Sequence, residues 1–340
     1  MNTLKICLAI ILVASGGIIS GYAQEKSPYI PEIHGTIRAK YEYEPQINAG
    51  RFQVRNARVG VNGIIIPIIS YKAEIDLSDE GKIKMLDAYV RFSPEKVKAN
   101  VTLGQMRVPF TIDAHRSPHT QYFANRSFIA KQVGNVRDVG LAGMYQFGKT
   151  VPITIEGGIF NGSGLTNQKD FWTKTYNFSA KVTASFFDRF VVVASAQKIK
   201  PEDVNIMMWD AGAYYDDTLW HIEAEYLRKN YAHGAFSGVN AVDAFVSRKF
   251  PLKKYLTGIS ALGRYDYMSN HSDGIKNEEG QLYANDPERH RMTLGTTLHF
   301  GVKKVYAEIR LNYEKYFYKQ GVTPGISEQD KFVVELMCHF

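Results

Sequence analysis

The chain has 340 residues, of which 45% are hydrophobic and 22% are charged, and its formal net charge is +7 at pH 7. That surplus of positive charge is modest, and a nucleic-acid-binding protein usually concentrates such charge on one face. After the N-terminal segment, no apolar run reaches the roughly 18 residues that a membrane-spanning helix needs. A membrane protein of this composition would therefore cross the bilayer with strands.

Residues 1–23 have the layout of a secretory signal peptide. Lys5 precedes an apolar run, and small residues lead to Gly21-Tyr22-Ala23. We predict cleavage after Ala23 and export from the cytoplasm, which leaves residues 24–340 as one domain. Cys7 would then be removed and Cys338 would stand alone, so no intramolecular disulfide is expected.

Strict alternation of apolar and polar residues dominates the rest of the chain, which is typical of strands with one apolar and one polar face. In one segment, Phe52 and Val54 are out of phase with Val59 and Val61, which predicts a β-bulge near Arg55. The sixteen predicted strands cover residues 32–44, 51–63, 69–78, 83–92, 99–106, 138–147, 152–160, 174–186, 189–198, 207–215, 218–229, 240–249, 255–267, 290–300, 303–317 and 330–340.

The connections between these strands fall into two alternating groups. Tight turns such as Phe187-Asp188 alternate with long polar loops such as 107–137, 161–173 and 268–289. Short turns on one rim, long loops on the other and an even strand number indicate a transmembrane antiparallel up-and-down β-barrel. The sequence therefore predicts an all-β protein of about 16 strands in the outer membrane of a Gram-negative bacterium.

The last strand shows which face would meet lipid. Its apolar positions share one parity, and closure of the sheet would leave no strand edge in the bilayer. We expect partners in the lipid bilayer, in lipopolysaccharide and in the barrel-assembly machinery, which would engage this strand at its end, Phe340. The residues expected to face lipid are Phe332, Val334, Leu336, Cys338 and Phe340.

Loop 107–137 is the third long connection and carries enough apolar side chains to pack against the inside of the barrel. The loop has five cations and a single acid, Asp113, so it would place a ring of positive charge at a pore constriction. The wall has more anions than cations by inward parity, but charges beyond a Debye length of about 8–10 Å are screened. The predicted constriction cations are Arg107, Arg116, Arg126, Lys131 and Arg137. The predicted pore-wall cations are Arg38, Lys40, Arg58, Lys72 and Arg91.

Six segments make the chain resemble the phosphate-selective porin O and P family of outer-membrane channels. These are FQVRNARVGVNG (52–63) with YKAEIDLS (71–78), DAYVRF (87–92), GQMRVPF (104–110), NRSF (125–128) and RDVGL (137–141). The resemblance implies a sixteen-stranded homotrimer with an inward third loop whose arginines lead anions inward. It assigns that role to Arg107, Arg126 and Arg137. The chain has Asn125 where an acidic residue is expected, which puts a supporting ion pair in doubt.

The function indicated is a porin for passive diffusion of small hydrophilic solutes, with a mild anion preference and with phosphate or polyphosphate as candidate solutes. Four alternatives remain open. The loop could plug the lumen and leave a structural or adhesive barrel, or its arginines could only form salt bridges with the wall. An enzyme built on His115, His119 or Ser163, or a metal site at His115 and His119, has weak support. No enzyme activity, cofactor, metal or nucleic-acid partner is expected.

Overall fold

The computed structural model describes residues 27, 29–79, 82–132, 136–165, 168–200, 204–272, 277–281, 283–284, 286–302 and 304–340. The predicted signal peptide, 1–23, lies outside the described residues. Within strands and helices, the side chains at positions 79, 131, 132 and 302 are also outside the description.

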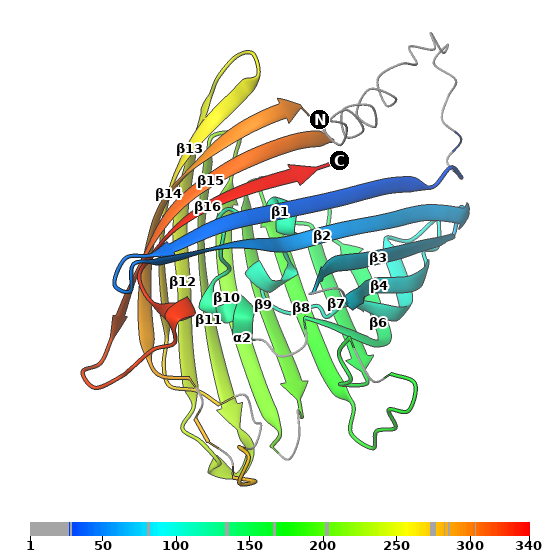
Figure 1. Cartoon of the computed structure of the whole chain (residues 1–340). Helices are drawn as coiled ribbons and strands as arrows, with labels where there is room; N and C mark the ends of the chain where they lie inside the picture. The colour runs from blue at the N-terminus through cyan, green and yellow to red at the C-terminus, as the bar shows by residue number, and fades with distance from the viewer. Residues whose placement is uncertain are drawn as a thin grey trace, which may run out of the picture.

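The described residues form a closed antiparallel barrel in which each strand pairs with its sequence neighbours and β1 pairs with β16 (Figure 1). This confirms the predicted fold and strand number. The strands are β1 (Glu32–Glu44), β2 (Ala49–Ile66), β3 (Ile69–Asp79), β4 (Lys82–Phe92), β5 (Ala99–Arg107), β6 (Arg137–Phe147), β7 (Ile153–Phe160), β8 (Asn177–Phe186), β9 (Phe190–Ile199), β10 (Ile206–Asp216), β11 (Trp220–Tyr231), β12 (Val239–Pro251), β13 (Leu256–Met268), β14 (Arg289–Val302), β15 (Val305–Tyr318) and β16 (Lys331–His339).

In the described part of the chain, helical structure is confined to short turns in the loops. Among the described residues, no helix is long and apolar enough to cross a membrane. These turns are η1 (Asp113–His115), η2 (Pro118–Thr120), α2 (Phe128–Gln132), η3 (Ala232–Gly234) and η4 (Ile326–Glu328).

The two rims of the barrel differ as the sequence predicts. In Figure 1 the end of β16 and the short turns lie at the upper rim, and the long loops after β7, β11, β13 and β15 lie at the lower rim. At the upper rim, β8 and β9 are joined through Phe187 and Asp188, which both have positive φ. Two successive residues with positive φ match the twist of the flanking strands and allow a very tight hairpin.

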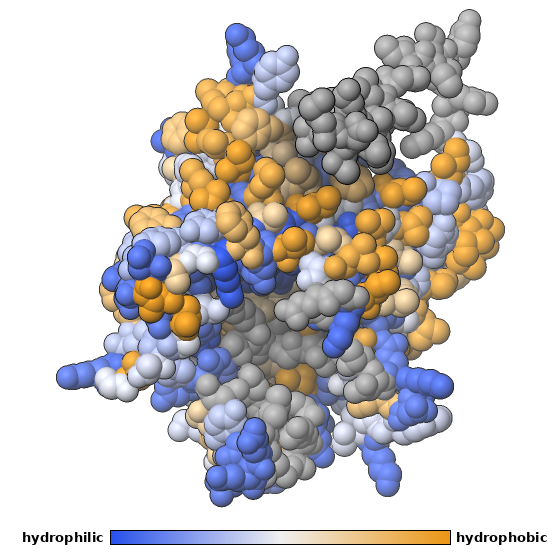
Figure 2. Space-filling view, in the orientation of Figure 1, coloured by the Kyte–Doolittle hydropathy of each residue, from blue (hydrophilic) through white to orange (hydrophobic). Residues whose placement is uncertain are grey.

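The outer face of the barrel is apolar and the inner face is charged. Phe332, Val334, Leu336 and Phe340 are each about half exposed, whereas Glu335 between them is fully buried against other lumenal groups. Figure 2 shows hydrophobic side chains gathered over the upper and right parts of the visible surface, with hydrophilic ones at the lower rim. The parity predicted for β16 is therefore the observed one.

The predicted β-bulge is present in β2. Arg38 of β1 pairs with Asn56, and the next residue, Ala39, pairs with Val54, so Arg55 is the extra residue. The bulge restores the phase of the apolar positions on the two sides of Arg55.

A hydrocarbon-facing exterior predicts that charge on the outer face of β16 destabilises the barrel. Leu336→Arg should lower the free energy of unfolding by about 2–4 kcal/mol if the site lies near the bilayer midplane. Urea unfolding in lipid vesicles measures this loss. Ile326→Arg is the matched control, because Ile326 is exposed in the loop that contains η4. Equal losses for the two variants would contradict a lipid-facing β16.

Candidate pore constriction

The loop from residue 108 to 136 starts where two glycines leave room for an aromatic ring. Phe160 on β7 is almost fully buried and packs with Met106 and Val108 at the end of β5. A Cβ at Gly140 or Gly158 would lie 2.8 Å from an atom of the Phe160 ring, so neither position accepts a side chain without movement. This packing fixes the direction in which the chain leaves β5.

The apolar side of the loop packs against apolar residues on the inner face of the barrel. Phe110, Ala114, Phe128 and Ile129 form one buried cluster with wall residues of β9 to β13 and β15. An apolar patch on a lumenal wall needs a covering element, because exposed apolar area costs roughly 25 cal/mol per Å². The wall residues of this cluster are Ile199, Ile206, Met208, Leu227, Tyr231, Val239, Ala241, Met268 and Tyr316.

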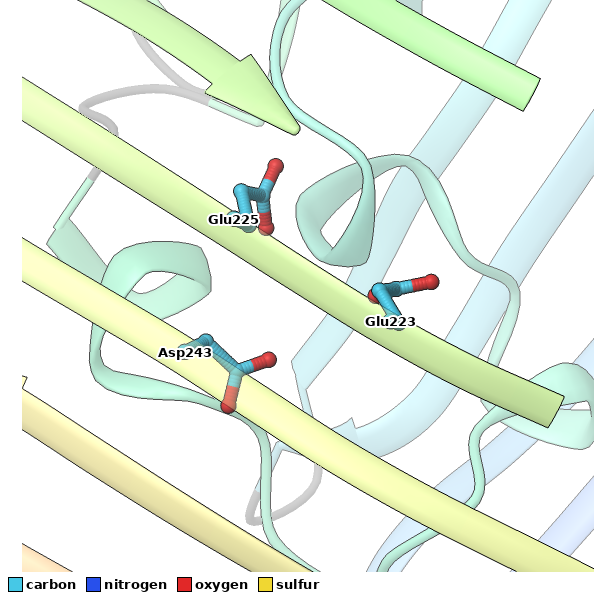
Figure 3. Close-up of side chains that lie close together, drawn as sticks. All are labelled: Glu223, Glu225 and Asp243. Carbon is cyan, nitrogen blue, oxygen red and sulfur yellow. The ribbon is translucent and has the colours of Figure 1, made fainter. Parts of the chain in front are cut away.

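The loop is also held by lumenal carboxylates of β11 (Figure 3). The backbone N–H of Ile112 donates to Glu225, and that of Asp113 donates to the same carboxylate at 3.5 Å. The Arg116 guanidinium donates to both oxygens of Glu223, whose side chain is fully buried. Buried carboxylates require such donors, since an unpaired buried charge is costly.

Glu223, Glu225 and Asp243 form the group of possible metal-ligating side chains within the described residues, with ligand atoms within 4.8 Å of one another (Figure 3). The carboxylates of Glu223 and Glu225 already have protein donors, whereas Oδ1 of Asp243 has no hydrogen-bond partner among the described residues. Glu223 accepts from Arg116, Glu225 accepts from Ile112, and Asp243 lies 3.9 Å from the guanidinium of Arg264. Glu223 and Glu225 thus anchor the loop, and their oxygens are not free to bind a cation.

Asn125 connects the loop to two opposite charges of the wall. Its Oδ1 accepts from Lys40 at 3.1 Å, and its Nδ2 donates to Glu314 at 2.9 Å. Neighbouring loop carbonyls are held as well, because Arg38 donates to Ala124 at 2.7 Å and Arg291 donates to Arg126 at 2.7 Å. An amide serves this position because it both donates and accepts.

The predicted constriction cations divide by their partners. Arg116 pairs with Glu223, and Arg137 pairs with Asp87 and, at 3.4 Å, with Glu74. The loop sequence has five cations and one acid. Wall carboxylates offset part of this positive charge, so the local charge predicted from the loop sequence alone is too high. The side chain of Lys131 is outside the described side chains.

Arg107 and Arg126 have a different environment. Arg107 donates to the carbonyl of His115 and, at 3.2 Å, to the hydroxyl of Ser117. Arg126 donates to the carbonyls of Ala114 at 3.2 Å and Arg116 at 3.0 Å. Neutral acceptors orient these guanidinium groups and leave their charge uncompensated by a bonded carboxylate.

Most of the predicted wall cations are paired. Arg38 bonds Glu335 at 2.7 Å and Lys40 bonds Glu42 at 2.6 Å. Arg58 lies 3.0 Å from Asp76, and Lys72 lies 2.7 Å from Asp87. Arg91 has a hydroxyl partner, Thr102, at 3.0 Å. Wall cations and wall anions therefore largely neutralise one another.

Five arginines from the loop and the adjoining strands lie close enough to interact electrostatically. We call them the arginine cluster: Arg55, Arg58, Arg107, Arg126 and Arg137. Burial lowers the pKa of Arg126 to about 10, Asp113 opposes that shift, and Arg58 adds to it. Mutual repulsion between guanidinium groups is relieved by an anion placed among them.

The arginine cluster adjoins open space on the side of the barrel opposite the apolar loop contacts. A cavity of about 280 Å³ is lined by Arg107, Arg91, Lys72, His115 and Ser117, among others. Cavities of about 320 Å³ and about 450 Å³ lie on the other sides of the segment from Ile112 to Tyr122. The loop thus borders several polar chambers within the lumen.

Arg55 was not among the predicted site residues. Its direction could not be assigned from the sequence, because it is the extra residue of the bulge, where the alternation of strand faces breaks down. The loop places Arg126 within electrostatic range of Arg55.

The histidines and the serine that were considered for other chemistry have structural roles in the described part of the chain. His119 stacks on His339 with ring centroids 3.9 Å apart. Ser163 lies in a turn in which Gly162 and Gly164 donate their N–H groups to Asp138 at 2.7 Å and 3.2 Å. Neither arrangement forms a nucleophile with a general base.

A closed sixteen-strand barrel with an apolar exterior, a charged lumen and an internal loop defines the porin class of outer-membrane proteins. The model of the phosphate-selective porin O and P family matches residues 33–188 of the chain, which confirms the resemblance seen in the sequence. No curated protein sequence matches the chain.

Solved porin structures share the fold at low sequence identity. An anion-selective porin from Comamonas acidovorans superimposes with a TM-score of 0.64 and 11% identity, covering 91% of this chain and 98% of its own. The trimer form of OmpT from Vibrio cholerae gives 0.60 and 12%, covering 92% and 98%. The channel DcaP of Acinetobacter baumannii gives 0.59 and 13%, covering 94% and 99%. The family match covers the first part of the barrel, and the solved structures show that nearly the whole chain shares their fold.

The Arg116–Glu223 pair provides a test of how the loop is held. Arg116→Gln should lower the free energy of unfolding by about 3–5 kcal/mol, because it leaves Glu223 charged and buried without its main partner. The double variant Arg116→Gln/Glu223→Gln should recover most of this loss. Urea unfolding gives the energies, and hydrogen exchange of the Ile112 amide reports the loop. A single variant as stable as the unmodified protein would exclude this anchor.

Proposed function

We propose that the protein is an anion-preferring porin for passive diffusion of small hydrophilic solutes. The observation that carries this proposal is the arginine cluster. Within the described residues, Arg55, Arg107 and Arg126 have no carboxylate partner, whereas the wall charges are mostly paired. Net positive charge is therefore concentrated at one place along the pore, where it raises the local concentration of anions.

Phosphate or polyphosphate is a candidate solute because of the guanidinium geometry. Arginine presents donors in a planar fork that fits phosphate oxygens in a bidentate way. The Arg107 and Arg126 groups are held by neutral acceptors, so they keep charge and some donors for a passing anion. Chloride would be attracted by charge alone.

The proposed function implies a location in the outer membrane. Export would use the signal peptide cleaved after Ala23, and the barrel-assembly machinery would recognise the last strand with Phe340. The barrel would then contact the lipid bilayer and lipopolysaccharide of a Gram-negative outer membrane. A homotrimer is supported by the trimer form of the Vibrio relative. No catalytic activity is part of this proposal.

A second candidate is a barrel with a plugged lumen and a structural or adhesive role. It is favoured by the extent of the loop contacts, which reach from Ser179 and Lys181 on β8 around to Arg38 on β1. The two candidates differ in a directly measurable property. Discrete conductance steps in a planar bilayer support the porin, and their absence supports the plug.

The zero-current potential under a potassium chloride gradient tests the anion preference. The unmodified protein should give the sign of an anion-preferring channel. Two charges within about 8 Å of a permeating ion contribute roughly 1 kcal/mol in water. These charges attract the anion and repel the cation by the same amount, so Arg107→Gln/Arg126→Gln should lower the anion-to-cation permeability ratio about 30-fold at low salt, and less at high salt.

Arg51→Gln is the control for this measurement, because Arg51 is half exposed and paired with Glu42. It should leave the zero-current potential unchanged. A cation-preferring unmodified channel would overturn the proposal. Chloride current that is unaffected by millimolar phosphate would remove phosphate as a recognised solute while leaving the general anion preference in place.

A further inference from the structure

Two cations on the outside of the barrel lie near the long-loop rim, toward the ends of β9 and β11. On β9, Gln197 and Ile199 are buried inward, so Lys198 between them points outward. On β11, Leu227 and Lys229 are fully buried, so Arg228 points outward. Within the described residues, neither Lys198 nor Arg228 has a carboxylate partner.

Each cation has an aromatic residue near it. The Lys198 ammonium lies 5.8 Å from the centroid of the Phe178 ring. Trp209 on β10 lies between the two strands, pairs directly with Arg228, and is 54% exposed. Tryptophan and outward cations at the end of membrane strands occupy the level of lipid headgroups.

The Arg228 guanidinium is held in a fixed orientation. It donates to the side-chain oxygens of Asn230 at 3.1 Å and Asn240 at 2.9 Å. Gly238 leaves space for it, since a Cβ there would lie 2.3 Å from Nη2 of Arg228. Neutral acceptors again position the group without neutralising its charge.

Other outward cations have different partners. Lys315 on β15 pairs with Asp330, and Lys319 pairs with Glu288 at 3.0 Å. At the short-turn rim, Arg248 lies between the rings of Trp220 and Phe250, at 4.8 Å and 4.9 Å from their centroids. Lys198 and Arg228 thus form a local excess of positive charge on the outer surface of β9 to β11.

We propose that Lys198, Arg228 and Trp209 form a binding site for a phosphate group of the anionic glycolipid in the outer leaflet. The cations supply charge and donors to the phosphate, and the Trp209 ring packs along the sugar and the acyl chains. The inference rests on the outer-membrane placement in the proposed function, with the long loops outside the cell. It is independent of ion conduction.

The test uses the full mature protein in detergent, with native mass spectrometry of bound lipid A. Each cation near an anionic lipid surface strengthens binding about fivefold, so Lys198→Gln/Arg228→Gln should weaken lipid A binding about 25-fold. Arg248→Gln removes one outward charge at the opposite rim and should leave this affinity unchanged. Dephosphorylated lipid A should bind the unmodified protein as weakly as phosphorylated lipid A binds the double variant.

Equal binding of phosphorylated and dephosphorylated lipid A by the unmodified protein would overturn the proposal, even if the double variant failed to fold. Unchanged binding by a folded double variant would overturn it as well. The zero-current potential of the double variant should match that of the unmodified protein. Failure of the porin proposal would appear in that potential alone, and failure of the lipid site would appear in lipid A binding alone.

Discussion

The constraint on which the whole structure depends is that backbone N–H and C=O groups in hydrocarbon must find partners within the protein. The pairing of β1 with β16 meets that requirement by removing both free edges of the sheet. Once the sheet is closed, its two faces meet different surroundings. The alternation of side chains then gives an apolar outer face and a charged lumen, as in β16, where Val334 and Leu336 flank Glu335.

A charged lumen creates a second requirement, because many buried ionised groups need partners within the protein. Neighbouring strands meet it in part through pairs such as Arg38 with Glu335. The internal loop meets a further part of it on β11, where its N–H groups and Arg116 satisfy Glu225 and Glu223. The position of the loop thus depends on its bonds to wall carboxylates as well as on the packing of its own apolar side chains.

The pairing of most wall charges also explains how a few charges at one place in the pore can determine its ion selectivity. Carboxylates are plentiful on the wall, yet Glu223 and Asp87 near the loop are committed to Arg116 and Arg137. Charges left without a bonded carboxylate then dominate the nearby field, because screening removes more distant contributions. The same principle applies on the outer surface, where Lys198 and Arg228 are oriented by neutral groups.

The sequence by itself determined the strand number, the parity of the faces and the bulge near Arg55. These features follow from local alternation and turn composition, which one chain displays directly. It also identified Arg107 and Arg126 as cations of the loop. Only the tertiary structure decided that Arg116 and Arg137 are paired while Arg107 and Arg126 are not, and that Arg55 joins them. The reason is physical: the field at a side chain depends on groups within a few ångströms, and Arg116 meets Glu223 across more than a hundred residues of chain.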